Sequence, residues 1–425
     1  MKKQHSFNSN VNLKTEFIAG MTSFFAISYI IIVNPIILKD AGIPASLSVF
    51  ATIFSSALGC LLMYFIANAP VIITPGMGVN AFFTYTLVQS MKFTWQQALA
   101  VSAVSGLLYL IVAFTPLSRL FADAIPASLK HGITAGIGMF LVVLGLEKAQ
   151  LIRSGGQRSL LALGDLSSPL VLLALFCLIL TLVLYLRKVP GGFVIGIVVT
   201  SILAFILRLD TKAASSTSLS MLGSYGKLLF QTDFDGIFTV KFLVAVFSMT
   251  MILVFESMGL LQGLLGDSSN FQRAYRANAL SAFCSSFMGT SPTVAAAESA
   301  SGIESGGRTG LTSLTAGIMF LLSLFFIPLL SYVPDAAIAP VILITGALMM
   351  EQIGQVDLTD FSEWFPAFLI IVLIPLTGSI STGLAFGFVA YPVAKLAAGQ
   401  KKDLSKTLVV LAGLFLLQLI GSALI

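Results

Sequence analysis

The sequence predicts an all-α protein that crosses a membrane many times, and three observations carry this prediction. Hydrophobic residues make up 57% of the 425 residues and charged residues only 10%, whereas a soluble chain carries charge on about a quarter of its residues. The apolar residues form continuous runs rather than the alternating pattern of a transmembrane β-barrel. Two of the runs are interrupted by Gly and Pro, about half a chain apart.

Seven apolar runs precede a polar stretch rich in Ser and Gly, and eight follow it. The stretch at 209–236 is the expected linker between two halves. The short runs at 363–378 and 380–398 leave the count over the last hundred residues open, and we expect about fourteen helices. An odd number of crossings brings the second half in from the opposite face, so the repeat is inverted. The runs lie at 16–38, 45–67, 71–90, 95–115, 128–147, 168–187 and 190–208, and then at 237–264, 272–288, 290–306, 309–332, 335–350, 363–378, 380–398 and 406–424.

The net charge of +5 reflects orientation in a bilayer rather than binding to nucleic acid, because the positive residues lie between apolar runs. A cytoplasmic N-terminus places most of them inside and few in the outer loops. The first run lacks a small-residue cleavage site, so we expect a retained helix in the plasma membrane. The inner set is Lys2, Lys3, Lys14, Arg119, Lys130, Arg187, Lys188, Arg273, Arg276, Arg308 and Lys395, and the outer set is Arg153, Arg158, Lys212 and Lys227.

The two interrupted runs carry polar groups where lipid would forbid them. The first reads TPGMGVNAFFTY at 74–85 and the second reads GTSPTVAAAESASG at 289–302. A matched pair of Gly- or Pro-broken segments indicates the binding site of a transporter built from repeats. Each break leaves backbone N–H groups unpaired at the start of a half-helix. Pro75, Gly76, Gly78, Pro292 and Ser299 are therefore expected to shape this site.

Glu256 is the most isolated charge in the sequence, since the run around it at 242–265 holds no other ionisable residue. A carboxyl group at bilayer depth costs about 2.5–3.5 kcal/mol on insertion scales, and it normally faces a polar cavity or a partner. Burial favours the neutral form of such an acid, which makes Glu256 the candidate for carrying a proton. The structural alternative is a carboxyl group hydrogen-bonded to a neighbouring helix.

Glu298 and Asn80 follow the two breaks at corresponding places. A carboxylate at Glu298 could accept hydrogen bonds from the N–H groups of a ligand, and the alternative is that it caps its own helix. The amide of Asn80 offers donors and an acceptor, enough to read the edge of a heterocycle, and the alternative is an interhelical hydrogen bond. Glu304 and Arg308 have the spacing of an i,i+4 ion pair.

Five aromatic residues lie near the same level, and one of them could stack on a flat ligand, although core packing is the usual role of such residues. They are Phe25, Tyr29, Phe82, Phe83 and Phe255.

Several classes of protein are not supported. The sequence has no phosphate-binding Gly-x-x-x-x-Gly-Lys-[Ser/Thr] loop and no His-Glu-x-x-His zinc motif. It has no Gly-x-Ser-x-Gly elbow of a serine hydrolase. Cys60, Cys177 and Cys284 lie in apolar runs, without the spacing of a metal site or a disulfide framework. We therefore expect no enzyme activity, no metal and no cofactor.

The motifs resemble those of the azaguanine-like purine permeases, a branch of the nucleobase–cation (nucleobase–ascorbate) symporter superfamily. The segment GMTSFFAISYI at 20–30 with VNP at 33–35 resembles the first helix of that branch, and TPGMGVNAFFTY resembles its third. ESASG at 298–302 and GGRTGL at 306–311 resemble its tenth-helix signature. AGIGMF at 135–140 and FPAF at 365–368 also fit, so the resemblance spans nearly the whole chain.

The resemblance implies seven-plus-seven helices divided into a core domain, at 16–115 and 237–332, and a gate domain, at 126–208 and 335–424. It implies discontinuous third and tenth helices with the substrate between them. Glu256 and Glu298 would bind the base with proton coupling, and Asn80 would be the polar group of the third helix. Apart from the resemblance, the positions of Phe82, Phe255 and Thr293 near the breaks make them further expected substrate contacts. A homodimer is a family-level expectation only.

Two departures from the branch reshape the expected pocket. Glu256-Ser-Met-Gly-Leu stands where the branch usually has Asp-Thr-x-Gly-Thr, and Val294 to Ala297 replace a stretch that usually carries Thr and Tyr. Together, the broken segments, the two acids and the family resemblance predict a proton-coupled importer of a purine nucleobase, hypoxanthine/guanine or adenine. The alternatives are a transporter of xanthine, uracil or a small anion on the same fold, or a membrane receptor or structural protein without a transport cycle.

Overall fold

The computed structural model describes residues 12–118, 120, 125–155, 161–209, 219–266 and 270–423. Within these ranges nine helices are long and apolar enough to cross a membrane, and three shorter helices are also apolar. The predicted class, an all-α polytopic membrane protein, is confirmed. Five of the residues that bear on orientation, Lys2, Lys3, Arg119, Arg158 and Lys212, lie outside the described ranges.

The first half folds into seven segments, of which the third is broken and the first is bent. The bend falls between α1 and α2, and a short hairpin of β2 (Ile152–Ser154) and β3 (Leu161–Leu163) follows the fifth segment. In order the segments are α1 (Leu13–Ile27) with α2 (Ile30–Asp40), α3 (Ala45–Leu62) with the π-helical turn Met63–Ala67, β1 (Ile73–Pro75) with α4 (Met77–Ala81) and the π-helical turn Phe82–Ser90, α5 (Trp95–Phe114), α7 (Ala127–Lys148), α8 (Pro169–Leu186) and α9 (Gly192–Ile206).

The second half repeats this order and adds one helix, α17 (Lys406–Ala423), which packs on α16. The eight runs predicted after the linker are thus seven repeat segments and this extra helix. The seven are α10 (Val240–Leu265), α11 (Phe271–Phe287), β4 (Thr293–Ala295) with α12 (Ser299–Glu304), α13 (Gly310–Leu322) with the 3-10 turn Ser323–Tyr332, α14 (Asp335–Met350) with Glu351–Gln355, α15 (Phe361–Thr377) and α16 (Ile380–Ala397), and the 3-10 turn Lys401–Asp403 precedes α17.

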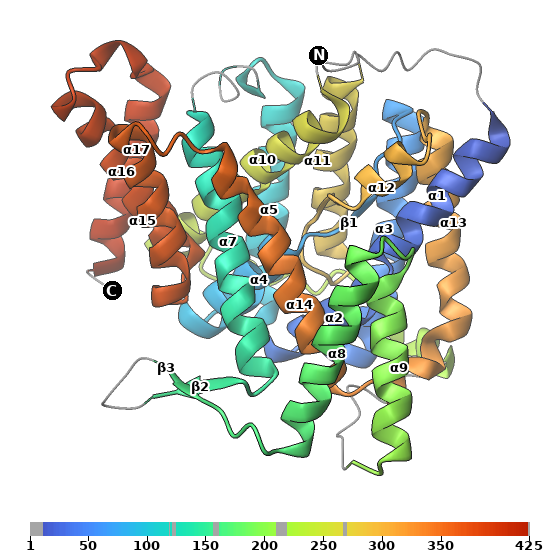
Figure 1. The fold of residues 1–425 in the computed structure, drawn as a ribbon. Helices are drawn as coiled ribbons and strands as arrows, with labels where there is room; N and C mark the ends of the chain where they lie inside the picture. Colours follow the sequence, from blue (N-terminus) through green and yellow to red (C-terminus); the bar gives the residue numbers. More distant parts are fainter. Residues whose placement is uncertain are drawn as a thin grey trace.

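The contacts between helices are reciprocal, as an internal two-fold relation requires. Helix α5 packs on α10 and α11, and its counterpart α13 packs on α1 and α3. Strand β1 lies against α3, and β4 lies against α11. The fifth segments of the two halves, α7 and α14, pack on each other, with α15 beside α7 (Figure 1). The chain therefore has the predicted seven-plus-seven inverted repeat with two discontinuous helices.

The described end of the stretch between the halves, from residue 219 onward, is more ordered than its composition indicates. Leu219–Lys227 forms a 3-10 helix that packs against α3. The hydroxyl of Tyr225 donates a hydrogen bond to the carbonyl oxygen of Met288, at 2.9 Å. Leu228 packs so closely on Gly289 that a Cβ there would lie 2.3 Å from its Cγ. This part of the linker is therefore attached to the end of α11.

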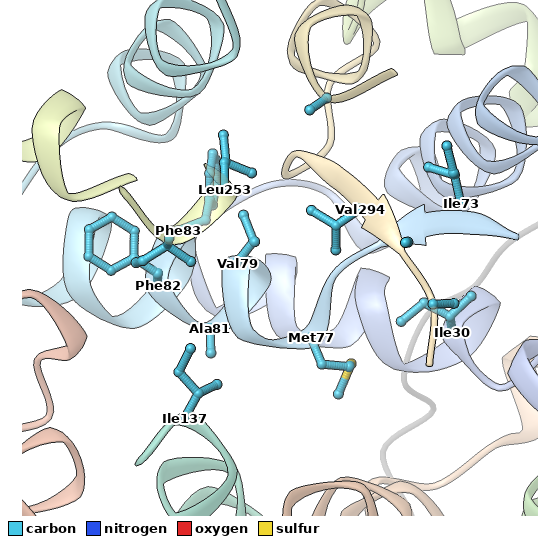
Figure 2. Close-up of a cluster of buried hydrophobic side chains, with 14 of the residues drawn as sticks. Ile30, Ile73, Met77, Val79, Ala81, Phe82, Phe83, Ile137, Leu253 and Val294 are labelled. Atoms are coloured by element: carbon cyan, nitrogen blue, oxygen red, sulfur yellow. The ribbon is translucent and has the colours of Figure 1, made fainter. Parts of the chain in front are cut away.

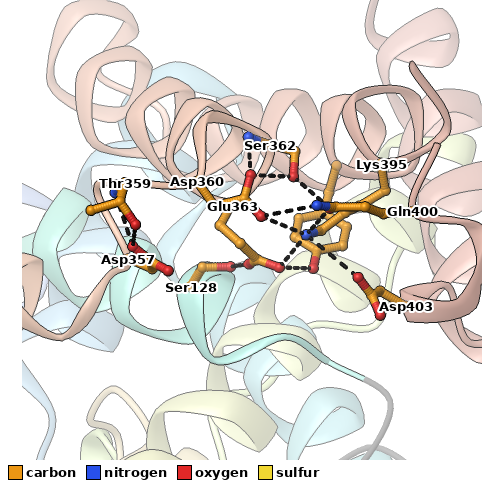
Figure 3. A network of polar contacts seen from close by, with 10 residues as sticks. Ser128, Asp357, Thr359, Asp360, Ser362, Glu363, Lys395, Gln400 and Asp403 are labelled. Atoms are coloured by element: carbon orange, nitrogen blue, oxygen red, sulfur yellow. Dashed lines mark hydrogen bonds and ion pairs between the residues drawn. The ribbon is translucent and has the colours of Figure 1, made fainter. Parts of the chain in front are cut away.

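A polar cluster joins α7, α15 and α16 at their ends (Figure 3). The ammonium of Lys395, whose side chain is only 2% exposed, lies 2.7 Å from a carboxylate oxygen of Glu363 and 3.3 Å from one of Asp360. Glu363 also accepts hydrogen bonds from the hydroxyls of Ser128 and Tyr391. A buried charge needs partners of this kind, so the cluster fixes the relative positions of the three helices.

Asp360 begins α15 as its N-cap. Its Oδ1 accepts hydrogen bonds from the hydroxyl of Ser362, at 2.7 Å, and from the backbone N–H of Ser362, at 2.8 Å. These bonds, with Lys395 nearby, hold the pKa of Asp360 at about 2. The carboxylate therefore stays ionised, and the cap intact, through the physiological pH range.

Candidate functional site

The two broken segments pair with each other at the centre of the molecule. Strands β1 and β4 are antiparallel, with Thr74 opposite Val294. The backbone N–H of Ala296 donates to the carbonyl oxygen of Ile72 at 2.9 Å, and the N–H of Ile72 donates to the hydroxyl of Ser299 at 2.9 Å. Backbone groups that leave a helix inside a membrane need such partners, and here each half of the chain supplies them to the other.

Glycine at position 76 permits this pairing. A Cβ at Gly76 would lie 2.3 Å from Cγ2 of Val294, closer than two non-bonded carbon atoms can approach. Pro75 ends β1, opposite Thr293, and the carbonyl oxygen of Pro292 accepts a hydrogen bond from the N–H of Gly76 at 3.4 Å. Figure 2 shows Val294 beside β1 with Ile73 nearby. Close packing at the crossing thus depends on the small residue predicted to shape the site.

Asn80 lies on α4, one turn beyond the first break. Its side chain is fully buried, and neither its amide nitrogen nor its amide oxygen has a hydrogen-bond partner within the described residues. Leaving such a group unpaired costs about 1–3 kcal/mol. The interhelical hydrogen bond considered as the alternative role of Asn80 is therefore absent from this part of the chain.

Glu256 lies in the middle of α10 and faces α4. Its side chain is 8% exposed, and its Oε2 has no hydrogen-bond partner within the described ranges. A Cβ at Gly78 would lie 3.3 Å from this oxygen, so the glycine lets the carboxyl group approach α4. One unpaired carboxyl oxygen and the unpaired amide of Asn80 thus belong to two helices in contact.

Glu298 stands at the N-terminal end of α12 but does not cap it with its side chain. The hydroxyl of Tyr29 donates a hydrogen bond to its Oε1, at 2.6 Å. Tyr29 is fully buried at the bend between α1 and α2, whereas Glu298 is half-buried. The helix-capping role considered for Glu298 is therefore wrong, and its partner comes from the first segment of the other half.

The other three residues predicted to contact the substrate, Thr293, Phe255 and Phe82, pack against side chains of the protein itself. The hydroxyl of Thr293 hydrogen-bonds to that of Ser281 on α11, at 2.6 Å. The ring of Phe255 stacks on Phe388 of α16, with centroids 6.1 Å apart. Phe82 is fully buried in the apolar cluster of Figure 2. Thr293 thus serves the packing of β4, and Phe255 connects α10 to α16.

Two roles at the ends of the segments were not foreseen. Glu16, 3% exposed, accepts hydrogen bonds from the backbone N–H groups of Arg308 and Thr309 and from the hydroxyl of Thr312, and so anchors α1 to the start of α13. The predicted ion pair between Glu304 and Arg308 is wrong. The guanidinium of Arg308 instead donates to the carbonyl oxygens of Ile303 and Gly307, which satisfies the end of α12.

The chemistry of the centre is that of a binding site for a polar ligand. Two carboxyl groups and one amide lie on α10, at the start of α12 and on α4, the elements at and around the two breaks. Within the ranges the structure describes, no group of three or more His, Cys, Asp or Glu residues is placed to hold a metal ion. Paired half-helices inside an inverted repeat are the architecture of a secondary transporter.

The comparisons agree with this class. Residues 14–386 match the Permease family, and the chain belongs to that family. It is 44% identical over 382 residues to the nucleobase transporter PlAzg2 of Paenibacillus larvae, covering 89% of this chain and 76% of that protein. It is 37% identical to the guanine/hypoxanthine permease PbuO of Bacillus subtilis, over 98% of this chain and 99% of that one. Adenine permease AdeP of Escherichia coli is 34% identical, over 96% and 93%.

Solved structures resemble the fold at low sequence identity. The transmembrane domain of the cyanobacterial bicarbonate transporter BicA matches with a TM-score of 0.67 and 17% identity, covering 89% of this chain and 98% of that one. The murine anion transporter Slc26a9 in its inward-facing state matches with a TM-score of 0.68 and 13% identity, covering 91% and 69%. The named relatives are permeases and a nucleobase transporter, so the chain is a multi-pass membrane transporter and not an enzyme.

Proposed function

We propose that the protein imports a purine nucleobase, hypoxanthine/guanine or adenine, in symport with protons. The observation that carries this proposal is a pair of buried, unpaired polar groups, the amide of Asn80 and one carboxyl oxygen of Glu256, on two helices that contact each other, α4 and α10. A purine ring presents N–H donors and ring-nitrogen acceptors along one edge, and these complement an amide and a carboxylate. The similarity to permeases named for guanine, hypoxanthine and adenine supports this substrate class.

In the proposed site, Asn80 and the backbone of both breaks hold the polar edge of the ring together with Glu298. Glu256 binds a substrate N–H or carries the coupled proton, since an isolated carboxyl group in an apolar helix is the group that can be neutral in one step and charged in another. Phe82, Phe255 and Thr293 contribute to substrate binding indirectly, because they hold the π-helical turn after α4, helix α10 and strand β4 in place. An inorganic anion is disfavoured, because two carboxyl groups would repel it.

Transport would proceed by displacement of a gate domain against a core domain. We assign the core to 16–115 and 237–332, the gate to 126–208 and 335–424, and the linker to 209–236. The mutual packing of α7, α14, α15 and α16, and the separate mutual packing of α1, α3, α5, α11 and α13, support this division. The protein would act in the plasma membrane with a cytoplasmic N-terminus, and as a homodimer through gate helices.

Uptake measurements test the function directly. Cells deficient in nucleobase uptake would express the protein and receive labelled hypoxanthine, guanine, adenine or uracil, with and without a protonophore. Accumulation of a purine that the protonophore abolishes is expected. If no base accumulates, purine import is wrong, and accumulation that is insensitive to the protonophore contradicts proton symport alone.

Replacing each of the two carboxyl groups by an amide is expected to impair a different step, base binding for Glu298 and proton coupling for Glu256. Glu298→Gln should abolish base binding while leaving membrane insertion intact, because the amide no longer offers a charged acceptor. Glu256→Gln should weaken the dependence of uptake on pH more than it affects folding. Equilibrium binding, pH profiles of uptake and the amount of monodisperse protein are the measurements. Unchanged pH profiles in both variants would contradict these roles.

A further inference from the structure

We propose that Tyr29 is a positioning residue that sets the orientation of Glu298 and connects it to α9 of the proposed gate. This inference rests on the proposed function, because it concerns the same site. Tyr29 and Glu298 lie 269 residues apart in the sequence, and the hydroxyl of Tyr29 meets Oε1 of Glu298 at 2.6 Å. Tyr29 lies where α1 gives way to α2, so its backbone is at a bend rather than inside a regular helix.

The hydrogen bond from Tyr29 determines the orientation of the Glu298 carboxyl group. A phenol O–H donates to a carboxylate oxygen, here Oε1, and this bond restrains rotation of the carboxyl group. Glu298 does not cap α12 with its side chain. The carboxyl group, held by Tyr29 in one orientation, offers its remaining acceptor positions to an N–H of the ligand. Without the phenol, the carboxyl group could rotate, and the ligand would have to order it on binding.

The ring of Tyr29 contacts the opposite domain. It packs edge-on against Phe193 of α9, with centroids 5.2 Å apart and an angle of 81° between the planes. Phe193 in turn stacks on Tyr185 of α8, with centroids 6.0 Å apart. Tyr29 thus touches the carboxyl group through its hydroxyl and α9 through its ring. Movement of α9 relative to α1 would withdraw support from the ring, and the orientation of Glu298 would change with it.

The test begins with Tyr29→Phe, which keeps the ring on Phe193 and removes only the hydroxyl. Purified full-length protein in lipid nanodiscs would be titrated with labelled hypoxanthine, guanine and adenine. Affinity for the preferred base should fall about 10- to 100-fold, the range for a hydrogen bond to a charged group. Affinity within twofold of the wild type would overturn the inference. Failure of the wild type to bind any base would instead overturn the proposed function.

A matched control is available in the same chain. Tyr391→Phe removes another tyrosine–carboxylate hydrogen bond, the one to Glu363 at 2.5 Å in the polar cluster of α15 and α16. It should leave base affinity within about twofold, and melting temperatures would show whether both variants fold. If Tyr391→Phe weakened binding as much as Tyr29→Phe, the effect would be general and the inference wrong.

Ligand discrimination separates positioning from simple structural support. A set of N-methylated hypoxanthines lacks the individual N–H groups that Glu298 could accept. Tyr29→Phe should reduce, by about tenfold, the discrimination against the analogue that the wild type rejects most strongly, because that discrimination depends on a correctly oriented carboxylate. A purely structural role would weaken all ligands alike, and that result would overturn the proposal.

Phe193→Leu examines the contact with α9 without touching Tyr29 or Glu298. Loss of an aromatic pair of this kind should weaken base binding by about 2- to 10-fold. Unchanged binding and unchanged uptake by Phe193→Leu would contradict the connection to α9, even if Tyr29→Phe behaves as expected.

Discussion

At the scale of single residues, the centre of the protein keeps polar groups that its own structure does not satisfy. Asn80 is fully buried and its amide is unpaired within the described residues. One carboxyl oxygen of Glu256 is likewise buried and has no hydrogen-bond partner there. Buried polar groups in folded proteins normally find partners. The few that do not are expected at functional sites, where stability is sacrificed for binding.

Asn80→Leu should therefore separate stability from function. Leucine has nearly the same size and removes an amide that no described residue satisfies, so the melting temperature of the detergent-solubilised protein should stay equal or rise, by the equivalent of about 1–3 kcal/mol. Uptake of the preferred purine should fall at least tenfold. A large loss of thermal stability would show that the amide has a structural partner.

Residue chemistry was the part of the site most accessible from the sequence. Isolated charges in apolar runs, such as Glu256 and Glu298, are conspicuous because lipid penalises them. The partner of Glu298 was not accessible, since Tyr29 is one of many aromatic residues and no local pattern indicates that it lies beside a residue of the other half. Glu16 was missed for a similar reason, because its hydrogen-bond donors, the backbone N–H groups of Arg308 and Thr309 before α13, come within reach only when two distant helices meet.

At the scale of elements, the breaks themselves were predictable and their pairing was not. Pro and Gly within an apolar run indicate an interruption, and Pro75 and Pro292 fall where the interruptions occur. The strand pairing between Thr74 and Val294 depends on the three-dimensional arrangement of the two halves. The predicted pair of Glu304 and Arg308 failed because the unpaired carbonyl groups at the end of α12 are better placed for the guanidinium.

The crossing of the strands predicts a specific steric effect. Gly76→Ala should destabilise the protein by about 1–3 kcal/mol, because the new methyl group would overlap Cγ2 of Val294. Adding Val294→Ala should recover most of the loss, since two residues in contact do not act additively. Thermal unfolding in detergent would measure both variants.

Gly413→Ala in α17 is the control for this steric effect, because nothing lies within 4 Å of the added methyl group. It should leave stability unchanged or slightly higher, as alanine favours a helix. If Val294→Ala failed to rescue Gly76→Ala, the clash would not be the cause of the loss.

At the scale of the whole molecule, the ends of α2 and α7 are joined by an ion pair between the proposed core and gate. The ammonium of Lys148 lies 2.6 Å from Oδ2 of Asp40, and the hydroxyl of Tyr85 donates to the same oxygen at 2.8 Å. Gln89 donates to the backbone oxygen of Asp40. Under the proposed orientation this junction lies on the outer side, where it would hold the two domains together.

Removing this pair should favour opening toward the outside. Lys148→Met should shift the equilibrium by up to about fivefold, because a partly exposed ion pair contributes roughly 0.2–1 kcal/mol. A cysteine at buried Thr84, in a background without the three native cysteines, would report the shift. In Lys148→Met it should react faster with a membrane-impermeant thiol reagent, and high salt should have the same effect on the parent protein that carries only this cysteine.

Lys92→Met, a change of the same kind at an exposed lysine near the end of the third segment, should leave labelling unchanged. Equal labelling rates in Lys148→Met and the parent protein would contradict a role for the ion pair in closure.

The overall architecture followed from the sequence because the length and apolar character of each run determine whether it can span a bilayer. The segment at 219–227 is an exception, since a polar composition concealed a 3-10 helix that depends on Tyr225 reaching Met288. Likewise, α11 is a membrane segment with a rather polar sequence, which buries Tyr275 and Asn278 against other helices rather than lipid.

The bond between Ile72 and Ser299 spans 227 residues of sequence. At the pace of protein synthesis, about 5–20 residues per second, roughly 10–45 s separate the appearance of the two. During that interval the nascent first half holds an interrupted helix whose permanent partner does not yet exist. Until β4 has been synthesised, the insertion machinery, water or another segment must supply hydrogen-bond partners to the unpaired backbone groups of β1. Completion of the binding centre is therefore a late event in biogenesis.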